Sequence, residues 1–332
     1  MKYTVRIILF LSVFFSFCAR KEKVDTTDIS YEMEIQRFEN DVMNIHLDSI
    51  NAEIDRLHAK YDEFLDLFSL EIIQIGPVGN PSYPDFLRSF VTDYMINDVY
   101  NQVQDKYSDI SWLRNKLEDG LKRFSYYFEG YPLPKVVTYI SGFNHSMAMT
   151  DSVSGIGLDK YLGHDNDYYN KLGYASYIKR NMIPAKIPTD FMKAFAMTHF
   201  KYDDTNDNLI RQMIYHGKIM YFVDKMLPNE SDTLVFGYTS DQLAFCRSHE
   251  EQMWVYLIEN KLLFTTDQFT IIKFIGEAPF TKDFSRESPG QAAIWLGYRI
   301  VEAYMKEQDI SLVNLMAEED YQLILEDSYY NP

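Results

Sequence analysis

The sequence predicts an α+β fold, a mostly helical single domain with a small sheet of two or three strands. Apolar residues recur three and four positions apart between residues 31 and 128, and again from Asp190 nearly to the end of the chain. Between these helical regions, residues 136–140 are β-branched and aromatic, and residues 155–158 form a second short extended candidate. Helices on either side of a small sheet define the class.

The composition is that of an acidic globular protein. Of 332 residues, 49 are acidic and 32 are Lys or Arg, which gives a formal net charge of −17. This excess excludes nucleic acid as a partner, since binding to phosphates rests on basic side chains. An apolar content of 46% is enough to bury a core and excludes disorder of the whole chain.

The N-terminus has the architecture of an export signal. Lys2 and Arg6 precede an apolar run over residues 7–17, and Cys18 follows at once. Eleven helical residues span about 16 Å, about half of a hydrocarbon core, so a permanent transmembrane helix is not expected. We predict a signal peptide at residues 1–17.

Cys18 is the predicted lipidation site. The run before it, FSFC at residues 15–18, resembles a bacterial lipobox, although Phe17 stands where a small residue is usual. Two or three acyl chains, such as palmitate, would anchor the protein to a membrane without help from charge. The alternatives are ordinary cleavage without a lipid, or a plain buried cysteine.

The rest of the chain predicts a tether and one domain. Residues 18–30 are polar without periodicity, and no Pro/Gly/Ser-rich linker or repeat follows, so residues 31–332 form a single domain. After processing, Cys246 is the only cysteine besides Cys18, so no intramolecular disulfide stabilises the fold.

A central helix is predicted over residues 208–227, with Asp207 as its N-cap and Pro228 after its end. The segment is apolar almost all round, which is typical of a helix buried in the middle of a domain. Asp224 falls within the apolar stripe and His216 at its edge. Two interpretations of His216 stay open, a hydrogen-bonded core histidine and a member of a functional site.

A second helix is predicted over residues 240–263, with Thr239 and Gln242 spaced as a capping box. Glu250 lies in the middle of its apolar stripe. Either Glu250 accepts hydrogen bonds from a neighbouring helix start or an arginine, or it belongs to a present or former site.

A third helix is predicted after Ser288 as N-cap and Pro289 as first helical residue. Its Gly297 would let another helix approach closely. At the C-terminus, apolar residues continue to Tyr329 and Tyr330, so we expect the tail to dock back on the domain and not to be disordered.

The sequence does not supply a catalytic set. None of the seven histidines lies in a zinc-protease motif: in the segment from His216 to Met220, Gly217 replaces the general base and Met220 the second ligand. Serine-hydrolase, P-loop and dinucleotide-binding motifs do not occur either. We therefore predict no enzyme activity, no cofactor and no metal site.

Several segments, in this order, resemble the gliding-motility lipoprotein GldB family of Bacteroidetes, which has no assigned reaction. Besides the N-terminal signal, these segments are IQRFE at 35–39, GLDKYLG at 157–163, MIYHGK at 213–218, GEAPF at 276–280 and SPG at 288–290. The order of sheet, central helix and second helix also resembles zinc-protease relatives. That resemblance implies a zincin-like arrangement of a buried central helix, with His216, Glu250 and Asp224 as a candidate vestigial site.

The leading hypothesis is a non-catalytic cell-envelope lipoprotein that supports gliding motility or related envelope machinery and binds envelope proteins or peptide in a cleft between the sheet and the C-terminal helices. The alternative is a zinc-dependent peptidase-like hydrolase with an atypical metal site. The tether is mixed in charge, whereas surface-exported lipoproteins of this phylum carry acidic runs after the cysteine. We therefore expect a periplasm-facing protein, lipid-anchored in the cell membrane or outer membrane.

Overall fold

A computed structural model describes residues 24–332 of the chain. The predicted signal peptide, residues 1–17, and the predicted lipidation site Cys18 lie outside the described residues. From residue 24 onward, no helix combines the length and the apolar character that crossing a membrane requires.

The sheet has four strands in the order β1-β2-β4-β3. They are β1 (Ile35–Arg37), β2 (Lys135–Tyr139), β3 (Met147–Met149) and β4 (Val153–Gly157). Strand β2 pairs in parallel with both β1 and β4, while β3 is antiparallel to β4. The predicted small sheet is confirmed, but the sequence indicated helix at Ile35, where pairing with β2 decides the strand.

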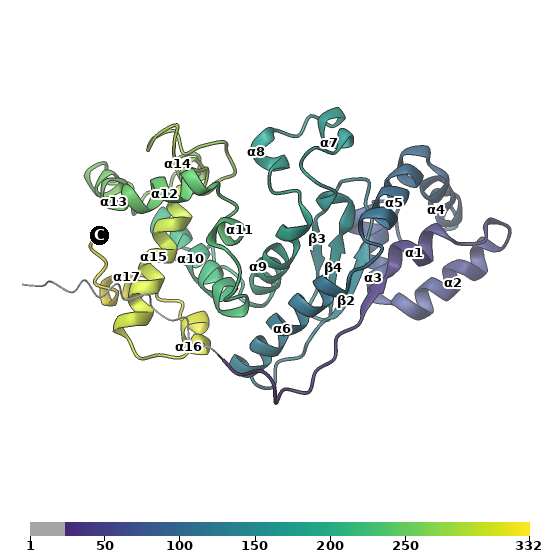
Figure 1. The fold of residues 1–332 in the computed structure, drawn as a ribbon, viewed down its shortest axis with the longest axis horizontal. Helices are drawn as coiled ribbons and strands as arrows, with labels where there is room; N and C mark the ends of the chain where they lie inside the picture. Colours follow the sequence, from purple (N-terminus) through teal and green to yellow (C-terminus); the bar gives the residue numbers. More distant parts are fainter. Residues whose placement is uncertain (1–23) are drawn as a thin grey trace, which may run out of the picture.

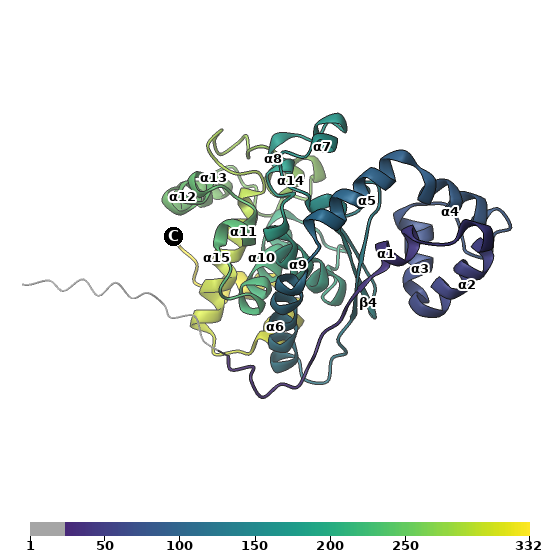
Figure 2. The same ribbon diagram turned by 45° about the vertical axis from the view of Figure 1, so that its right-hand side comes forward.

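One face of the sheet is covered by the N-terminal helices. These are α1 (Phe38–Met43), α2 (Ile50–Tyr61), α3 (Glu63–Leu67) and α4 (Tyr83–Thr92). Val137 and Tyr139 of β2 pack with Phe38, Phe64 and Phe68 in one apolar cluster. These helices form one end of the molecule in Figures 1 and 2.

The opposite face of the sheet packs on α5 (Tyr94–Lys106), α6 (Ser111–Tyr127) and α9 (Ile187–His199). Val136 and Ile140 join Phe124 and Phe195 in a second, larger cluster, and the rings of Phe124 and Phe195 meet edge to face at 4.8 Å. The sheet is thus shared by both clusters.

Two short helices, α7 (Asp167–Lys171) and α8 (Ser176–Lys179), lie at the top of the middle of the molecule in Figure 1. The remaining α-helices extend the second cluster to the other end. They are α10 (Leu209–Met226), α11 (Asp232–Phe236), α12 (Ser240–Ser248), α13 (Glu250–Glu259), α14 (Gln268–Ile275), α15 (Ala292–Glu307), α16 (Leu312–Ala317) and α17 (Tyr321–Asp327). The mostly helical α+β class is confirmed, and α10 is buried along almost its whole length, as the sequence predicts. Its N-cap is Asn208, whose side chain accepts from Arg211 N, and not Asp207.

Helices α10 and α15 touch backbone to backbone at two glycines. A Cβ at Gly297 would stand 1.8 Å from Met213 O, and one at Gly217 would stand 2.3 Å from the carbonyl of Gly297. No other residue type allows this approach, so Gly297 has the role that the sequence predicts for it.

Two predicted helices differ from those observed. The segment 240–263 begins with the predicted capping box at Thr239 and Gln242, but it breaks at His249 into α12 and α13. There Ser248 Oγ bonds Ala244 O, and His249 Nδ1 lies 3.1 Å from Phe245 O, so side chains compete with the helical backbone bonds.

The second difference is at the start of α15. Ser288 is not its N-cap; its buried hydroxyl donates to Thr281 O and accepts from Thr281 N, and it closes a loop. The cap position is taken by Gln291, which has a positive φ of 60° and no capping side-chain bond.

The C-terminal tail docks on the domain, as the sequence predicts. Ile324 is fully buried, and Tyr330 donates to Glu250 Oε1 at 2.9 Å while its ring meets Trp254 at 5.3 Å. Tyr329, by contrast, is 74% exposed.

Replacing Gly297 with Ala should lower the free energy of unfolding by about 3 kcal/mol or more, because the new methyl group overlaps Met213 O and both partners are backbone. Urea unfolding measures this. Gly79→Ala is the matched control, since nothing lies within 4 Å of the added Cβ there. Equal stability of the two variants would contradict the tight crossing.

Removing the Tyr330 hydroxyl should cost about 1 to 3 kcal/mol, because its bond to the Glu250 carboxylate is charge-assisted. We expect Tyr330→Phe to unfold at lower urea concentration than the wild type. Tyr329→Phe, at an exposed neighbour, should leave the midpoint unchanged. A tail that hangs in solvent would give the same midpoint for both.

Candidate functional site

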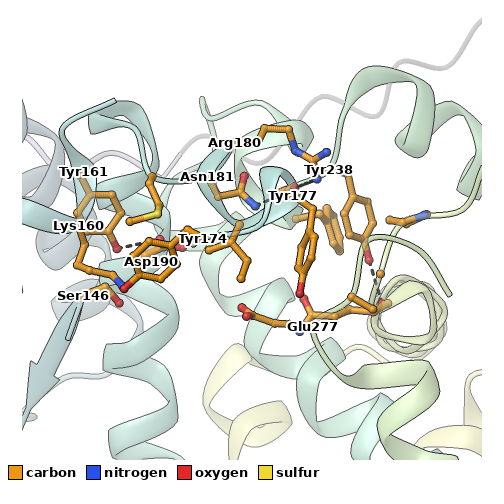
Figure 3. A pocket seen from close by; sticks show the side chains of 18 residues that line it. Ser146, Lys160, Tyr161, Tyr174, Tyr177, Arg180, Asn181, Asp190, Tyr238 and Glu277 are labelled. Carbon is orange, nitrogen blue, oxygen red and sulfur yellow. Dashed lines mark hydrogen bonds between the residues drawn. The ribbon is translucent and has the colours of Figure 1, made fainter. Parts of the chain in front are cut away.

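A cavity of about 340 Å³ lies between the sheet side of the molecule and the C-terminal helices. Its lining comes from segments far apart in the chain, including Lys160, Tyr161, Arg180, Asp190, Tyr238 and Glu277. Figure 3 shows Lys160, Tyr161 and Asp190 on one side, with Tyr238 and Glu277 on the other. The sequence predicts a binding cleft between the sheet and the C-terminal helices, and binding at this cavity stays a prediction.

The sheet-side wall is held by the buried carboxylate of Asp159. Its Oδ2 accepts from Ser141 N at 2.9 Å and Phe143 N at 2.7 Å, which fixes the loop after β2. Burial raises the pKa of Asp159, and these bonds partly offset that rise. Lys160 Nζ in turn donates to Phe143 O at 3.2 Å and Tyr174 Oη at 2.8 Å, so its charge is held at the wall of the cavity.

Asp190, in the first turn of α9, has two partners. Its Oδ2 accepts from Tyr161 Oη at 2.9 Å, and its Oδ1 forms an ion pair with Lys186 at 2.8 Å. Lys186 is 6% exposed and also donates to Thr189 Oγ1. The charge of Asp190 is therefore neutralised within the wall.

The opposite wall is built around Gly237, which ends α11 with a positive φ of 72°. Its carbonyl accepts from Arg180 Nη2 at 3.2 Å and from Asn181 Nδ2 at 3.1 Å. Next to it, Tyr238 Oη donates to Gln291 O at 3.0 Å. These bonds connect the α8 segment, the end of α11 and the start of α15.

A tightly closed loop forms the third side. A Cβ at Gly290 would stand 2.1 Å from Ala278 O, so the 276–280 and 288–290 segments lie directly against each other. Thr281 reinforces the contact, since its Oγ1 donates to Pro289 O and accepts from Ala292 N. Ala278, Pro289 and Gly290 all face the cavity.

Lys193 is a further charged residue of α9, one turn after Asp190. Burial lowers its pKa, and Lys186 lowers it further, while Asp190 and Glu277 raise it. No ion pair or hydrogen bond of its ammonium is found between residues 24 and 332.

His216 on α10 is close enough to Lys193 for its pKa to respond to the lysine charge. Its Nδ1 is buried and has no hydrogen-bond partner within the described part of the chain. Both interpretations of His216, a core histidine and a member of a site, stay open. Burial, followed by the charge of Lys193, lowers the pKa of His216 to about 4. It is therefore a neutral imidazole at physiological pH.

Glu250 lies in another neighbourhood. It accepts from Arg299 Nε at 3.0 Å, from Trp295 Nε1 at 3.3 Å and from Tyr330 Oη at 2.9 Å. The interpretation that an arginine satisfies this carboxylate agrees with these contacts.

Asp224, on α10, interacts electrostatically with residues of α15 near Glu250. Its charge acts on Tyr298 and Glu302 of α15, and Glu302 also pairs with Arg299. Of the three residues predicted for a vestigial site, Asp224 and Glu250 both act on the pKa of Glu302, whereas His216 is subject to the charge of Lys193.

A metal site would need at least three suitable ligands. Within residues 24–332, no group of three or more His, Cys, Asp or Glu side chains is arranged to hold an ion. Cys246 is buried in the core, and burial raises the pKa of its thiol to about 12, so it is not a reactive nucleophile.

Several lining residues were not singled out from the sequence. Lys160 and Glu277 lie inside two of the segments quoted above, which was the available signal. Arg180 and Asp190 had none, because nothing local distinguishes them from surface charges.

The chain was compared with protein families, curated proteins and solved structures. A family model described as "Gliding motility protein GldB" matches residues 19–332. No curated protein and no solved structure matches the chain.

The unpartnered His216 predicts a pH effect on stability. Its pKa is near 6.5 when unfolded and about 4 when folded, so the unfolded chain binds the extra proton and the free energy of unfolding falls as pH drops from 6.5 toward 4. The loss should be on the order of 2 to 3 kcal/mol. His216→Gln should flatten the difference in urea stability between pH 7 and pH 4.5.

His164→Gln provides the control, because His164 is exposed. It should keep the wild-type pH dependence. If His216→Gln keeps it as well, burial of a neutral His216 is not the cause.

Proposed function

The chain belongs to the GldB family of gliding motility proteins, and from this premise we propose that it is a non-catalytic envelope lipoprotein that binds a protein or peptide segment in the cavity of Figure 3. The family places it with a gliding-motility-associated lipoprotein system. The binding role and its site are our proposal.

The observation that carries this proposal is where the GldB-like segments meet. The 157–163, 276–280 and 288–290 segments are far apart in the sequence, yet each contributes lining to the same cavity. Structural needs explain Asp159 and Ser288, which are buried and bonded within their loops. Lys160 also bonds its surroundings, through Phe143 O and Tyr174 Oη, but Glu277 has no hydrogen bond or ion pair within the described residues and its side chain reaches the cavity.

The chemistry of the lining suits peptide. Tyr174, Tyr177 and Tyr238 supply flat surfaces that accept apolar side chains, and each carries a polar hydroxyl. Arg180 and Asn181 supply donors for peptide carbonyl or carboxylate oxygens. The lining combines aromatic and aliphatic side chains with polar and charged ones, as binding sites for small ligands do.

The proposal includes the anchor. Residues 1–17 are removed, Cys18 carries the lipid, residues 18–30 are the tether, and residues 31–332 form one domain facing the periplasm. The sheet shared by both apolar clusters supports the single domain. Gliding or related envelope machinery supplies the partner.

Affinity capture tests the binding role. Full-length tagged protein, cross-linked in intact cells and purified in detergent, should retain envelope proteins, and Tyr177→Ala should reduce their recovery about tenfold because it removes a cavity wall. Tyr126→Ala is the control, since Tyr126 is 56% exposed and away from the cavity lining. Equal recovery by both variants, or peptide hydrolysis by the purified protein, would contradict the proposal.

The anchor has its own test. Cys18→Ala should abolish incorporation of radiolabelled palmitate and leave an uncleaved or soluble form, because the acylated sulfur is lost. Cys246→Ala serves as the comparison, since its thiol is buried in the core. Normal labelling and membrane retention of Cys18→Ala would refute lipidation at this residue.

A further inference from the structure

We propose that the bound peptide lies extended along the free edge of strand β3 and pairs with it as a further strand of the sheet. This rests on the proposed function and names how the peptide of that site is held, namely through its backbone. The hydrogen bonds of β3 leave this edge open.

Strand β3 is an edge strand, joined to the sheet on one side only. The sheet order places β3 outside β4, to which it is antiparallel. At one end of this pairing, Ser146 O accepts from Gly157 N at 2.9 Å. At the other end, Thr150 N donates to Val153 O at 2.8 Å. Ser146 and Thr150 therefore both turn their backbone groups toward β4.

The residues between these two alternate in direction. In an antiparallel strand, the backbone groups of successive residues point to opposite edges, so Ala148 faces β4 as Ser146 and Thr150 do. Met147 and Met149 direct their N–H and C=O groups to the outer edge. No hydrogen bond of these groups to a loop, a helix or a side chain is found within residues 24–332. All three residues of β3 are partly exposed, whereas every residue of β4 is buried.

Helix α9 does not close this edge. It packs against both β3 and β4, which places it on a face of the sheet and not beyond the last strand (Figure 1). On that face, the side chains of Met147 and Met149 pack against the cluster that contains Phe191 and Phe195 of α9. The side chain of Ala148 packs in the cluster on the other face. The place next to β3 in the plane of the sheet is therefore not taken by α9.

The opposite edge of the sheet is tied to neighbouring helices. There Met33 N, just before β1, donates to Glu118 Oε2 of α6 at 3.1 Å, and Arg37 Nη1 of β1 donates to Tyr107 O at 2.9 Å. Proteins also protect edge strands with proline or charged side chains, and Met147–Met149 contains neither. An open edge of this kind is a template for an extended peptide.

Strand β3 runs from one cavity to another. Ser146, directly before β3, lines the cavity of Figure 3 together with Asp190 of α9. Asp151, two residues after β3, lines a second cavity of about 570 Å³ together with Thr198 near the end of α9. Five residue steps of a strand span about 17 Å, so a peptide of about six residues paired with β3 reaches from the first cavity to the second.

The side chains beside this edge are apolar. On α9, Met197 is 38% exposed and Ala194 is partly exposed, and their spacing places both on the side of the helix that carries Asp190. Met147 and Met149 add two more thioethers, which adapt to apolar side chains of different shape. Because alternate residues of an added strand point to the same face, the edge fits a peptide with apolar residues at every second position.

Peptide binding to full-length protein in detergent tests this mode. The probes are degenerate fluorescein-labelled hexapeptides with apolar residues at alternate positions, either unmodified or N-methylated at two adjacent central residues. N-methylation removes one backbone donor from each edge of the peptide, while its side chains stay the same. We expect the methylated mixture to be retained at least about tenfold less than the unmodified one.

Two variants of one residue separate backbone from side chain. Met149→Pro removes an N–H that points away from β4, which an edge strand tolerates, and should lower retention of the unmodified mixture about tenfold. Met149→Leu keeps the N–H and a similar volume, and it should bind as the wild type does. Thermal unfolding checks that each variant is folded.

Hydrogen exchange gives a readout that needs no variant. An excess of the unmodified mixture should slow exchange of the Met147 and Met149 amides about tenfold, because they gain partners. Exchange of the Ala148 amide should stay as it is, since this group already faces β4. If Met149→Pro unfolds, the exchange measurement and the methylated peptides decide.

Four outcomes would overturn the inference. These are no retention of either mixture, equal retention of both, retention unchanged by Met149→Pro in folded protein, and exchange at Met147 and Met149 that the unmodified mixture does not slow. If capture of envelope proteins still depends on Tyr177 in any of these cases, strand pairing fails while the proposed function stands. If nothing is captured and no peptide binds, both fail.

Discussion

The backbone contact of α10 with α15 at Gly217 and Gly297 constrains the rest of the C-terminal structure. It sets α10 in the centre, so neighbouring positions on that helix point in fixed directions. The charge of Lys193 on α9 acts on His216, while Lys218 donates to Met316 O and Glu318 O. The same contact places the start of α15 at the cavity and its Arg299 beside Glu250.

The segments that resemble the GldB family contain two kinds of residue: buried residues that hold the backbone in place, and residues that line the cavity. Asp159, Lys218 and Ser288 are buried and hold loops or helix ends through bonds to backbone groups. Lys160 and Glu277, in two of the same segments, reach the cavity. A wall residue next to a supporting residue has its position fixed by a rigid loop, which is what a selective binding site requires.

Charge is distributed unevenly over the molecule. Around Arg299, the carboxylates of Glu250 and Glu302 are balanced by one guanidinium, and the docked Tyr330 covers part of that group. Around the cavity, Asp190 pairs with Lys186, while Lys160 and Arg180 donate to carbonyl and hydroxyl oxygens and form no ion pair within the described residues.

The sequence by itself determined the helical class, the buried central helix, the capping box at Thr239 and the close approach at Gly297, because periodicity, capping and glycine are local properties. Only the tertiary structure decided strand β1, the break at His249 and the closed loop at Ser288, where pairing or side-chain bonds override local preference. It also decided the cavity. Arg180 and Asp190 have no local sequence signature. Their partners, Gly237 O for Arg180 and Lys186 for Asp190, are set by the tertiary structure.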